Sequence, residues 1–584
     1  MTIALALPLF AASTADARVS LVVLPPGTSV EQLAAAGMSP GLMSAGLGAV
    51  PARQTYLDIG QGNRVFGSLY EGELPRGRVP LDEPVRNRAI LRRAESAPAD
   101  VVPGLLAATL AAAGQRVAVR GASPARLPRL LARLRGDDLL IAIERPPPAK
   151  GRALAIGIAG RGYDGNLTSD STRLDGYVLA TDVAPTVLAR YGIPIPSQMS
   201  GQAIRAEGEV DAAAVVALGE RMAVISERRG PAIGLSLLAW IVVLAVAAAA
   251  GGRPIARTGV KLMGLAVVYL PLTLLAGAAL EPGEAAEMLL VMLGAPALAA
   301  ATLAAFGGYR ALAIASGLTV LAYAVDVVAG SPLTSLSLLG PNPGLGVRFY
   351  GIGNELEALL AVLIVAGTGA ALTGFAPRLS PRAAAIAFLA IGIGAAVVFA
   401  AGRFGADVGA AIVFPVGAAV AAAAIAARRR RAALLVAALP FAMLGLLALG
   451  DLVTGADAHL TRSVLDAGGL GDLADVAQRR LQLSARSFSR PIVLVFLPLI
   501  AVLAALAVAR RERIAAWLEG RPAMRAGLLG AVAATVVGTL ANDSGALLLE
   551  IGAAYLLVFT GFAWAEAGEA PSEQTKSYTP VHHT

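Results

Sequence analysis

The feature that most constrains this chain is a series of long apolar runs that begins at about residue 230. A helix of about 20 residues crosses a hydrocarbon core of roughly 30 Å, and each run is close to that length. Lipid offers no partners to backbone N–H and C=O groups, so such runs fold as helices. Charged residues make up only 15% of the chain, against about 25% in soluble proteins. The sequence therefore predicts an integral membrane protein.

We expect about eleven membrane-spanning helices between residues 229 and 565. Their approximate ranges are 232–250, 262–280, 287–306, 311–330, 354–374, 383–402, 408–427, 432–452, 491–509, 526–542 and 544–564. The basic connections, such as the four arginines at 428–431, then all fall on one side, which the positive-inside bias makes cytoplasmic. Residues 566–584 are polar, and we expect a disordered cytoplasmic tail there.

The first 228 residues have a different pattern. Residues 1–17 end in Ala15-Asp16-Ala17, which is typical of a signal-peptide cleavage site; an uncleaved anchor is the alternative, because a basic region before the apolar segment is missing. Residues 18–228 alternate strand-like and helix-like segments, which predicts an extracytoplasmic α/β sandwich with a largely parallel sheet. We expect strands at 20–25, 115–121, 138–144, 152–160 and 175–181, and helices at 105–114, 124–134 and 184–192.

Part of this domain resembles a known family. The stretch NLTSDSTRLDGYVLATDVAPTVLARYGIPIPSQMSGQAI (166–204) is similar to the closing strand, helix and turn of the alkaline phosphatase superfamily, with M-x-G at 199–201. SLVVLPPGTS (20–29) resembles the first strand of that fold, and LLIAIERPPP (139–148) resembles a later core strand. The resemblance covers roughly the N-terminal third of the chain, and it implies the fold shared by phosphatases, sulfatases and phosphoglycerate mutases.

The departures from that family concern its catalytic metals, which are bound by Asp and His around a Ser or Thr nucleophile. Here Pro25 follows the first strand where an Asp ligand is expected, and no histidine lies between residues 18 and 228. Four aspartates could bind a hard cation, although turn and capping roles suit them better: Asp164, Asp170, Asp175 and Asp182. Thr28 and Ser29 are the only plausible nucleophiles. We therefore expect a degenerate domain, assign no metal site, and identify no cofactor.

Polar residues of the membrane half gather near the predicted outer ends of the spans. They are Asp326, Arg348, Tyr350, Asn354, Glu355, Glu357, Arg403, Asp407, Asp451, His459, Arg462, Asn542, Asp543 and Glu550. Capping explains some of them, since Asn354 stands in an N-cap position and carboxylates suit the first turn. It does not explain Asp326, Asp451 and Glu550, which lie inside apolar runs. Ionisable groups at membrane depth are costly and usually mark a site.

Arginines alternating with carboxylates and one histidine are the side chains expected around an anionic ligand. The predicted catalytic residues are Glu355, Asp407 and His459, each able to act as a general base. The predicted substrate-binding residues are Arg348, Tyr350, Asn354, Glu357, Arg403, Arg462 and Asp543. Glycines at 344, 346, 351 and 353 in the preceding loop let the backbone approach a ligand closely.

These patterns favour a cell-envelope membrane protein with an outer-face site for a phosphate-bearing or lipid-linked substrate. It would act as a transferase or hydrolase, with the α/β domain as a binding or gating module. The expected partners are membrane lipids and a phosphate-bearing lipid or envelope polymer. Nucleic acid is not expected, because the basic residues behind the net charge of +8 flank membrane spans.

Two alternatives remain open: a transporter or flippase of an anionic solute or lipid, and a non-catalytic envelope scaffold. A transporter usually carries polar residues near the bilayer midplane, and few are present here. No HExxH, GxSxG or P-loop motif points to a particular reaction. The chain has no cysteine, which excludes disulfides and thiolate chemistry.

Overall fold

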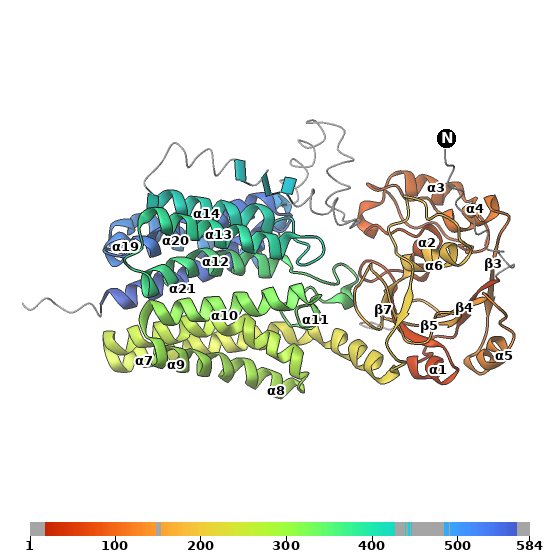
Figure 1. Ribbon diagram of the computed structural model, residues 1–584, viewed down its shortest axis with the longest axis horizontal. Helices are drawn as coiled ribbons and strands as arrows, with labels where there is room; N and C mark the ends of the chain where they lie inside the picture. The colour runs from red at the N-terminus through yellow and green to blue at the C-terminus, as the bar shows by residue number, and fades with distance from the viewer. Residues whose placement is uncertain are drawn as a thin grey trace, which may run out of the picture. The chain divides into compact units, whose positions relative to one another are not determined.

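The computed structural model describes residues 18–147, 153–426, 484–489 and 491–568, with six further residues between 438 and 446. The chain forms two compact units (Figure 1). The α/β unit comprises residues up to Ser226 together with the segment Asn342–Phe349, and the bundle unit comprises Glu227–Pro341 and the chain from Tyr350 onward. The predicted signal peptide at 1–17, most of the span at 432–452 and nearly all of the tail at 566–584 lie outside the described residues.

A six-stranded sheet organises the α/β unit, in the order β3-β1-β4-β5-β2-β7. The strands are β1 (Val19–Leu24), β2 (Ser39–Ser44), β3 (Val117–Gly121), β4 (Leu139–Glu144), β5 (Leu154–Gly160) and β7 (Tyr177–Leu179). The pairs β1–β3, β1–β4 and β2–β7 are parallel, but β5 runs antiparallel to both of its neighbours. The other five strands therefore run in one direction, so the sheet is largely parallel as expected, with β5 as its single antiparallel strand. The relation to the alkaline phosphatase superfamily stays a prediction.

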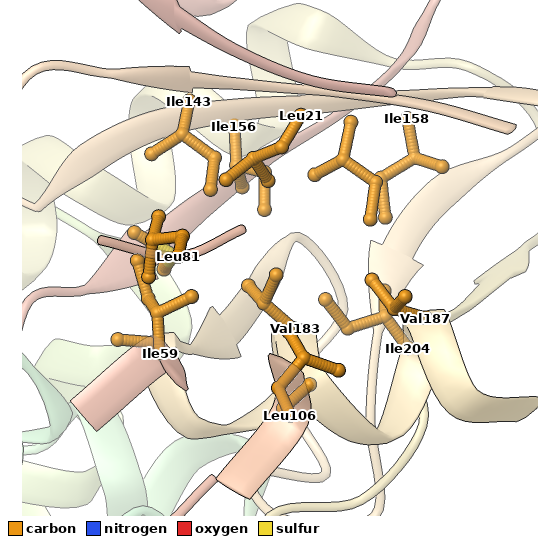
Figure 2. Packing of buried hydrophobic residues seen from close by; sticks show 14 of the residues in the cluster. Leu21, Ile59, Leu81, Leu106, Ile143, Ile156, Ile158, Val183, Val187 and Ile204 are labelled. Atoms are coloured by element: carbon orange, nitrogen blue, oxygen red, sulfur yellow. The ribbon is translucent and has the colours of Figure 1, made fainter. Parts of the chain in front are cut away.

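Helices pack on this sheet to close its core. They are α1 (Val30–Ala35), α2 (Ala52–Gln61), α4 (Leu105–Ala112), α5 (Leu127–Leu131) and α6 (Val183–Arg190), whereas α3 (Arg88–Glu95) packs through Ile90 in a separate cluster with Leu57 of α2. Figure 2 shows strand residues on one side of the core, with residues of α2, α4 and α6 facing them. Those labelled include Leu21, Ile143, Ile156 and Ile158 from strands and Ile59, Leu106, Val183 and Val187 from helices, all at most 2% exposed. Removing these apolar surfaces from water is the main force that holds the unit together.

One strand of this six-stranded sheet escaped the sequence analysis. β2 has the sequence SPGLMS, and all six of its residues are buried between β5 and β7. Ser-Pro-Gly is normally a turn signal, and proline is rare inside sheets. Gly41 is needed there because a Cβ at this position would lie 2.9 Å from Cβ of Leu167. Position 41 is therefore glycine because Leu167 leaves no room for a side chain, and not because glycine favours strands.

The longest helix of the molecule is a hairpin. α7 (Ala212–Leu280) contains Gly252 with φ 68° and ψ −163°, which is not helical. A methyl group on Gly259 would lie 2.7 Å from Cδ1 of Leu244, although residues 15 apart in a straight helix are about 22 Å apart. The chain therefore folds back at Gly252. Its two arms contain the predicted spans 232–250 and 262–280, joined by a much tighter turn than expected.

Most of the remaining helices of the bundle follow the other predicted spans. The remaining helices are α8 (Glu284–Leu289), α9 (Ala295–Phe306), α10 (Gly308–Val328), α11 (Pro332–Leu336), α12 (Asn354–Phe375), α13 (Pro381–Ala400), α14 (Ala410–Ala426), α18 (Pro491–Ala509), α19 (Arg511–Trp517), α20 (Pro522–Ala541) and α21 (Gly545–Ala567), of which α11 and α19 match no predicted span. Within the described part of the chain, seven helices are long and apolar enough to cross a membrane, or eight if the bent pair α18–α19 counts as one span. A multi-pass membrane protein is thus supported; the count of eleven stays a prediction.

α12 is the central helix of the bundle unit. It contacts α10, α13, α14, α20 and α21 (Figure 1). Glycines allow the closest of these approaches: Gly527 of α20 meets Gly369 of α12, and Gly530 of α20 meets Gly417 of α14. Small residues let helix backbones approach and pack where lipid provides no hydrophobic drive. α12, α14 and α20 therefore form a tight core, and the polar ends of these helices are held in register.

Candidate functional site

Polar side chains from three helix ends meet at one end of this core. We call this group the acid–amide cluster; it consists of Asn354 and Glu357 at the start of α12, Asp407 before α14, and Asn542 and Asp543 between α20 and α21. Four of the five were expected site residues, and Asn542 was noted as an outer-end polar residue. The structure brings together residues up to 189 positions apart in sequence.

Glu357 is the most buried member of the acid–amide cluster. It lies one turn into α12 and is 0% exposed. Its Oε2 accepts a hydrogen bond of 2.7 Å from Nδ2 of Asn542, and the same amide group donates to Oδ1 of Asn354 at 3.2 Å. Burying a carboxyl group is costly unless such donors compensate it. Asn542 therefore ties α12 to the α20–α21 turn through the group that most needs a partner.

Asp407 and Gly409 form the second side of the cluster. Asp407 is 3% exposed, and its Oδ1 accepts the backbone N–H of Gly409 at 3.1 Å, immediately before α14. This is a local turn closed by the Asp407 side chain just before the helix begins, and the bond is not to a helical N–H. A Cβ on Gly409 would lie 2.5 Å from both carboxyl oxygens of Glu357. Glycine is thus required at 409 because the Glu357 carboxyl occupies the space of a side chain.

The interpretation of Asn354 as an N-cap is wrong. Gly353 precedes the helix instead, and no side chain caps it. Nδ2 of Asn354 donates to Oδ1 of Asp543 at 3.1 Å, and its carbonyl oxygen accepts from Asn542. The amide is used for contacts between helices, which local sequence rules do not reveal.

Glu355 is the more accessible of the two first-turn glutamates. Its side chain is 31% exposed, and Oε1 lies 3.8 Å from Nη1 of Arg229 in α7. The same guanidinium donates to the carbonyl of Gly340. A half-exposed ion pair of this length contributes little to stability. Of the carboxyl groups here, Glu355 is therefore the one best placed to exchange its partner for a ligand.

The remaining predicted residues are distributed more widely. Asp326 caps a helix that the sequence analysis did not foresee: it accepts the N–H groups of Leu333 and Thr334 in α11 at 3.0 and 2.7 Å. The expectation that it needs no capping role is therefore wrong. The guanidinium of Arg403 is exposed and lies 5.0 Å from the ring of Phe404. Glu550 is half-buried in α21, and Oε1 has no hydrogen-bond partner among the described residues.

Arg348 belongs to the α/β unit and Tyr350 to the bundle unit. The expected grouping of Arg348 with Glu355 therefore stays a prediction. Three further outer-end residues, Asp451, His459 and Arg462, lie outside the described residues.

A buried acid in the α/β unit was not foreseen. Asp58 of α2 is 1% exposed and accepts hydrogen bonds at its Oδ1 from Gln54 at 2.8 Å and Gln61 at 3.1 Å. Burial raises the pKa of the Asp58 carboxyl to about 8, although these amides and the charges of Arg64 and Arg93 lower it. Perturbed acids of this kind occur at functional sites and also in structural networks. The Q-x3-D-x2-Q spacing was the available signal, because it places the three side chains on one helix face.

The residues considered for hydrolysis in the α/β unit have structural roles. Ser29 caps α1, where it forms a reciprocal capping box with Gln32. Thr28 donates to the carbonyl of Pro25 at 2.8 Å. Asp182 is fully buried and accepts hydrogen bonds from Ser169 and Ser171 at 2.7 and 2.6 Å, which fixes the loop before β7. In the part of the chain that the structure describes, three or more His, Asp or Glu side chains do not gather as a metal site would require.

No family model, no curated protein and no solved structure matches the chain.

Proposed function

We propose that this protein is a membrane-embedded envelope protein that binds a phosphate-bearing or lipid-linked substrate beside the acid–amide cluster, at Glu355 and Arg229, and transfers or cleaves a group there. The observation that carries the proposal is the meeting of carboxyl groups from three helix ends at one end of a bundle of mostly apolar helices. Such groups are expensive in a membrane and are retained chiefly for function. The degenerate α/β unit would act as a binding or gating module.

The residues have different parts in this proposal. Glu357 and Asp407 are buried and hold α12, α14 and α20 in place. Glu355 is the candidate general base, since its side chain is accessible and its ion pair with Arg229 is long, at 3.8 Å. Guanidinium groups bind phosphate oxygens in bidentate fashion, so Arg229 would exchange Glu355 for the substrate. Binding would then release the base.

The proposal is tested by identifying what the protein carries after purification. The full chain, extracted in a mild detergent, is analysed by native mass spectrometry and lipid analysis; we expect a retained phosphate-bearing lipid. Arg229→Gln should reduce its retention about tenfold, the loss of roughly one charge-assisted hydrogen bond. Arg253→Gln, an exposed arginine at the turn of α7, is the matched control. Equal retention in wild type and Arg229→Gln contradicts the proposal.

Transport is the second candidate, and one observation favours it. Glu550 lies inside α21 with an oxygen that has no hydrogen-bond partner among the described residues, as expected of a group that contacts a passing ion or solute. Flux of an anionic solute or labelled lipid across proteoliposomes, lost in Glu550→Gln, would support transport over surface chemistry.

A further inference from the structure

A cavity of about 420 Å³ lies at the end of the bundle unit away from the acid–amide cluster. Its walls come from the end of α9, the start of α10, the end of α12 and the start of α20. α12 has 22 residues, and at 1.5 Å per residue its two ends are about 33 Å apart. The cavity is therefore separate from the site proposed above and lies at the opposite end of α12.

Two arginines of the cavity wall donate to backbone carbonyls. Nε of Arg310 donates to the carbonyl of Gly374 at 2.9 Å, and Nη1 of Arg521 donates to the carbonyl of Trp517 at 3.0 Å. Among the described residues, no carboxylate forms an ion pair with either guanidinium. The one acid in the wall, Glu566, is paired with Nζ of Lys261 at 3.0 Å. The cavity thus has a net positive charge.

Tyr309 carries an unsatisfied polar group close to the two arginines. It lines the cavity and is 6% exposed, and its hydroxyl has no hydrogen-bond partner among the described residues. Buried tyrosine hydroxyls normally find one. The guanidinium of Arg521 lies 5.6 Å from the centre of the same ring. The unsatisfied hydroxyl and the guanidinium of Arg521 therefore belong to one small region.

Helix ends add to the positive potential. α10 begins at Gly308 and α20 at Pro522, and both starts line the cavity. The first N–H groups of a helix have no partner within the helix and carry the positive end of its dipole, so they favour an anion. Basic pockets between membrane helices bind lipid phosphate groups in this way.

We propose that this cavity binds a phosphate group, held by Arg310 and Arg521. The phosphate is that of a lipid headgroup or of a small soluble anion, and both reach a cavity at the ends of membrane helices. The positive-inside bias makes this end cytoplasmic.

The test uses the full chain in phosphatidylcholine nanodiscs, with two probes. Phosphatidic acid is titrated into the discs, and its retention is read by native mass spectrometry; inorganic phosphate is titrated in solution and followed by calorimetry. We expect the wild type to bind at least one probe, and the Arg310→Gln/Arg521→Gln double variant to bind it at least about tenfold more weakly. Binding of phosphate alone indicates a soluble ligand, and binding of phosphatidic acid only indicates a headgroup.

The matched control is Arg511→Gln/Arg513→Gln, which removes the same charge from exposed positions of the neighbouring α19 and should bind as the wild type does. Arg521→Gln alone removes one of the two guanidinium groups and should weaken binding about threefold; it keeps the test decisive if the double variant does not fold. The proposal is overturned if the wild type binds neither probe, if the control loses as much as the double variant, or if Arg521→Gln binds like the wild type.

Discussion

Asp58 in the α/β unit and Glu357 in the bundle unit are both carboxyl groups that are buried and stabilised by hydrogen bonds from side-chain amides. Each is a carboxyl group at most 1% exposed, each accepts hydrogen bonds from side-chain amides, and each lies against a glycine. They differ in where the amides come from. The donors to Asp58 are Gln54 and Gln61, four residues before it and three after, whereas the donor to Glu357 is Asn542, 185 residues away.

This difference has a physical consequence. The Asp58 network forms as soon as α2 is helical, because positions three and four apart share a face. The Glu357 network exists only when α12, α14 and α20 have assembled. Asp58 should therefore respond mainly to pH, and Glu357 mainly to substitutions on distant helices.

The largest expected effect is the pH dependence of the α/β unit. The folded-state pKa of Asp58 is about 8, above the ordinary value of about 3.9, so the folded protein binds this proton more tightly. The contribution of Asp58 to stability is then fully present below about pH 4 and is lost as the pH rises to about 8, by up to about 1.4 kcal/mol per pH unit. Urea unfolding of the full chain, read by proteolysis of the α/β unit, should show this decline.

Asp58→Asn should flatten that profile, because a neutral amide replaces the acid. Asp100→Asn removes an exposed aspartate of the same unit and should leave the slope unchanged. An unchanged slope in Asp58→Asn would show that the comparison rests on the wrong acid.

The second effect concerns the distant donor. Asn542→Leu removes the amide that serves Glu357 and Asn354 and should lower the free energy of unfolding of the bundle by about 3 kcal/mol, since a buried carboxyl group loses its donor. Thermal unfolding in detergent measures it. The double variant Asn542→Leu/Glu357→Leu should be less destabilised than the sum of the two single variants, because both partners are replaced by apolar groups. Simple additivity would contradict a direct coupling.

Gly409→Ala should have a smaller effect. The new methyl group would lie 2.5 Å from both carboxyl oxygens of Glu357, and overpacking of this kind typically costs about 1–3 kcal/mol. Gly394→Ala in α13 is the matched control, because a Cβ there meets nothing within 4 Å; it should be neutral or slightly stabilising, since alanine favours the helix. Equal melting temperatures in the two variants would refute the close packing at 409.

The smallest effect is expected at the edge of the acid–amide cluster. Asn354→Ala removes a hydrogen bond to Asp543, whose side chain is exposed, and the hydrogen bond from Asn542. Water replaces the first of these, so we expect a loss of about 1 kcal/mol. A loss as large as that of Asn542→Leu would show that the polar centre lies at Asn354 and not at Glu357.

The extent to which sequence predicts structure follows the same division between local and distant contacts. Apolar runs located the bundle helices, and alternation located most strands, because both patterns depend on residues a few positions apart. β2 was missed because it begins with Ser-Pro-Gly, which normally indicates a turn. Its glycine is required by the close approach of Leu167, a residue more than 100 positions away in the sequence. Most residues of the acid–amide cluster were predicted from their positions at the ends of spans. The hydrogen bonds that join them across helices were not predicted. Asn354 was assigned to a local cap, and only assembly shows that its amide joins Asn542 and Asp543.

The division of the chain has a consequence for the order of synthesis. The α/β unit includes Asn342–Phe349, where the carbonyl of Pro343 accepts from the Tyr177 hydroxyl and that of Leu345 accepts from the N–H of Gly48. Phe349 is translated roughly 120 residues after Ser226, which takes the ribosome about 6–25 s. During that interval α7 to α10 leave the ribosome while the α/β unit still lacks a segment. Its last contacts must therefore wait for the first helices of the bundle.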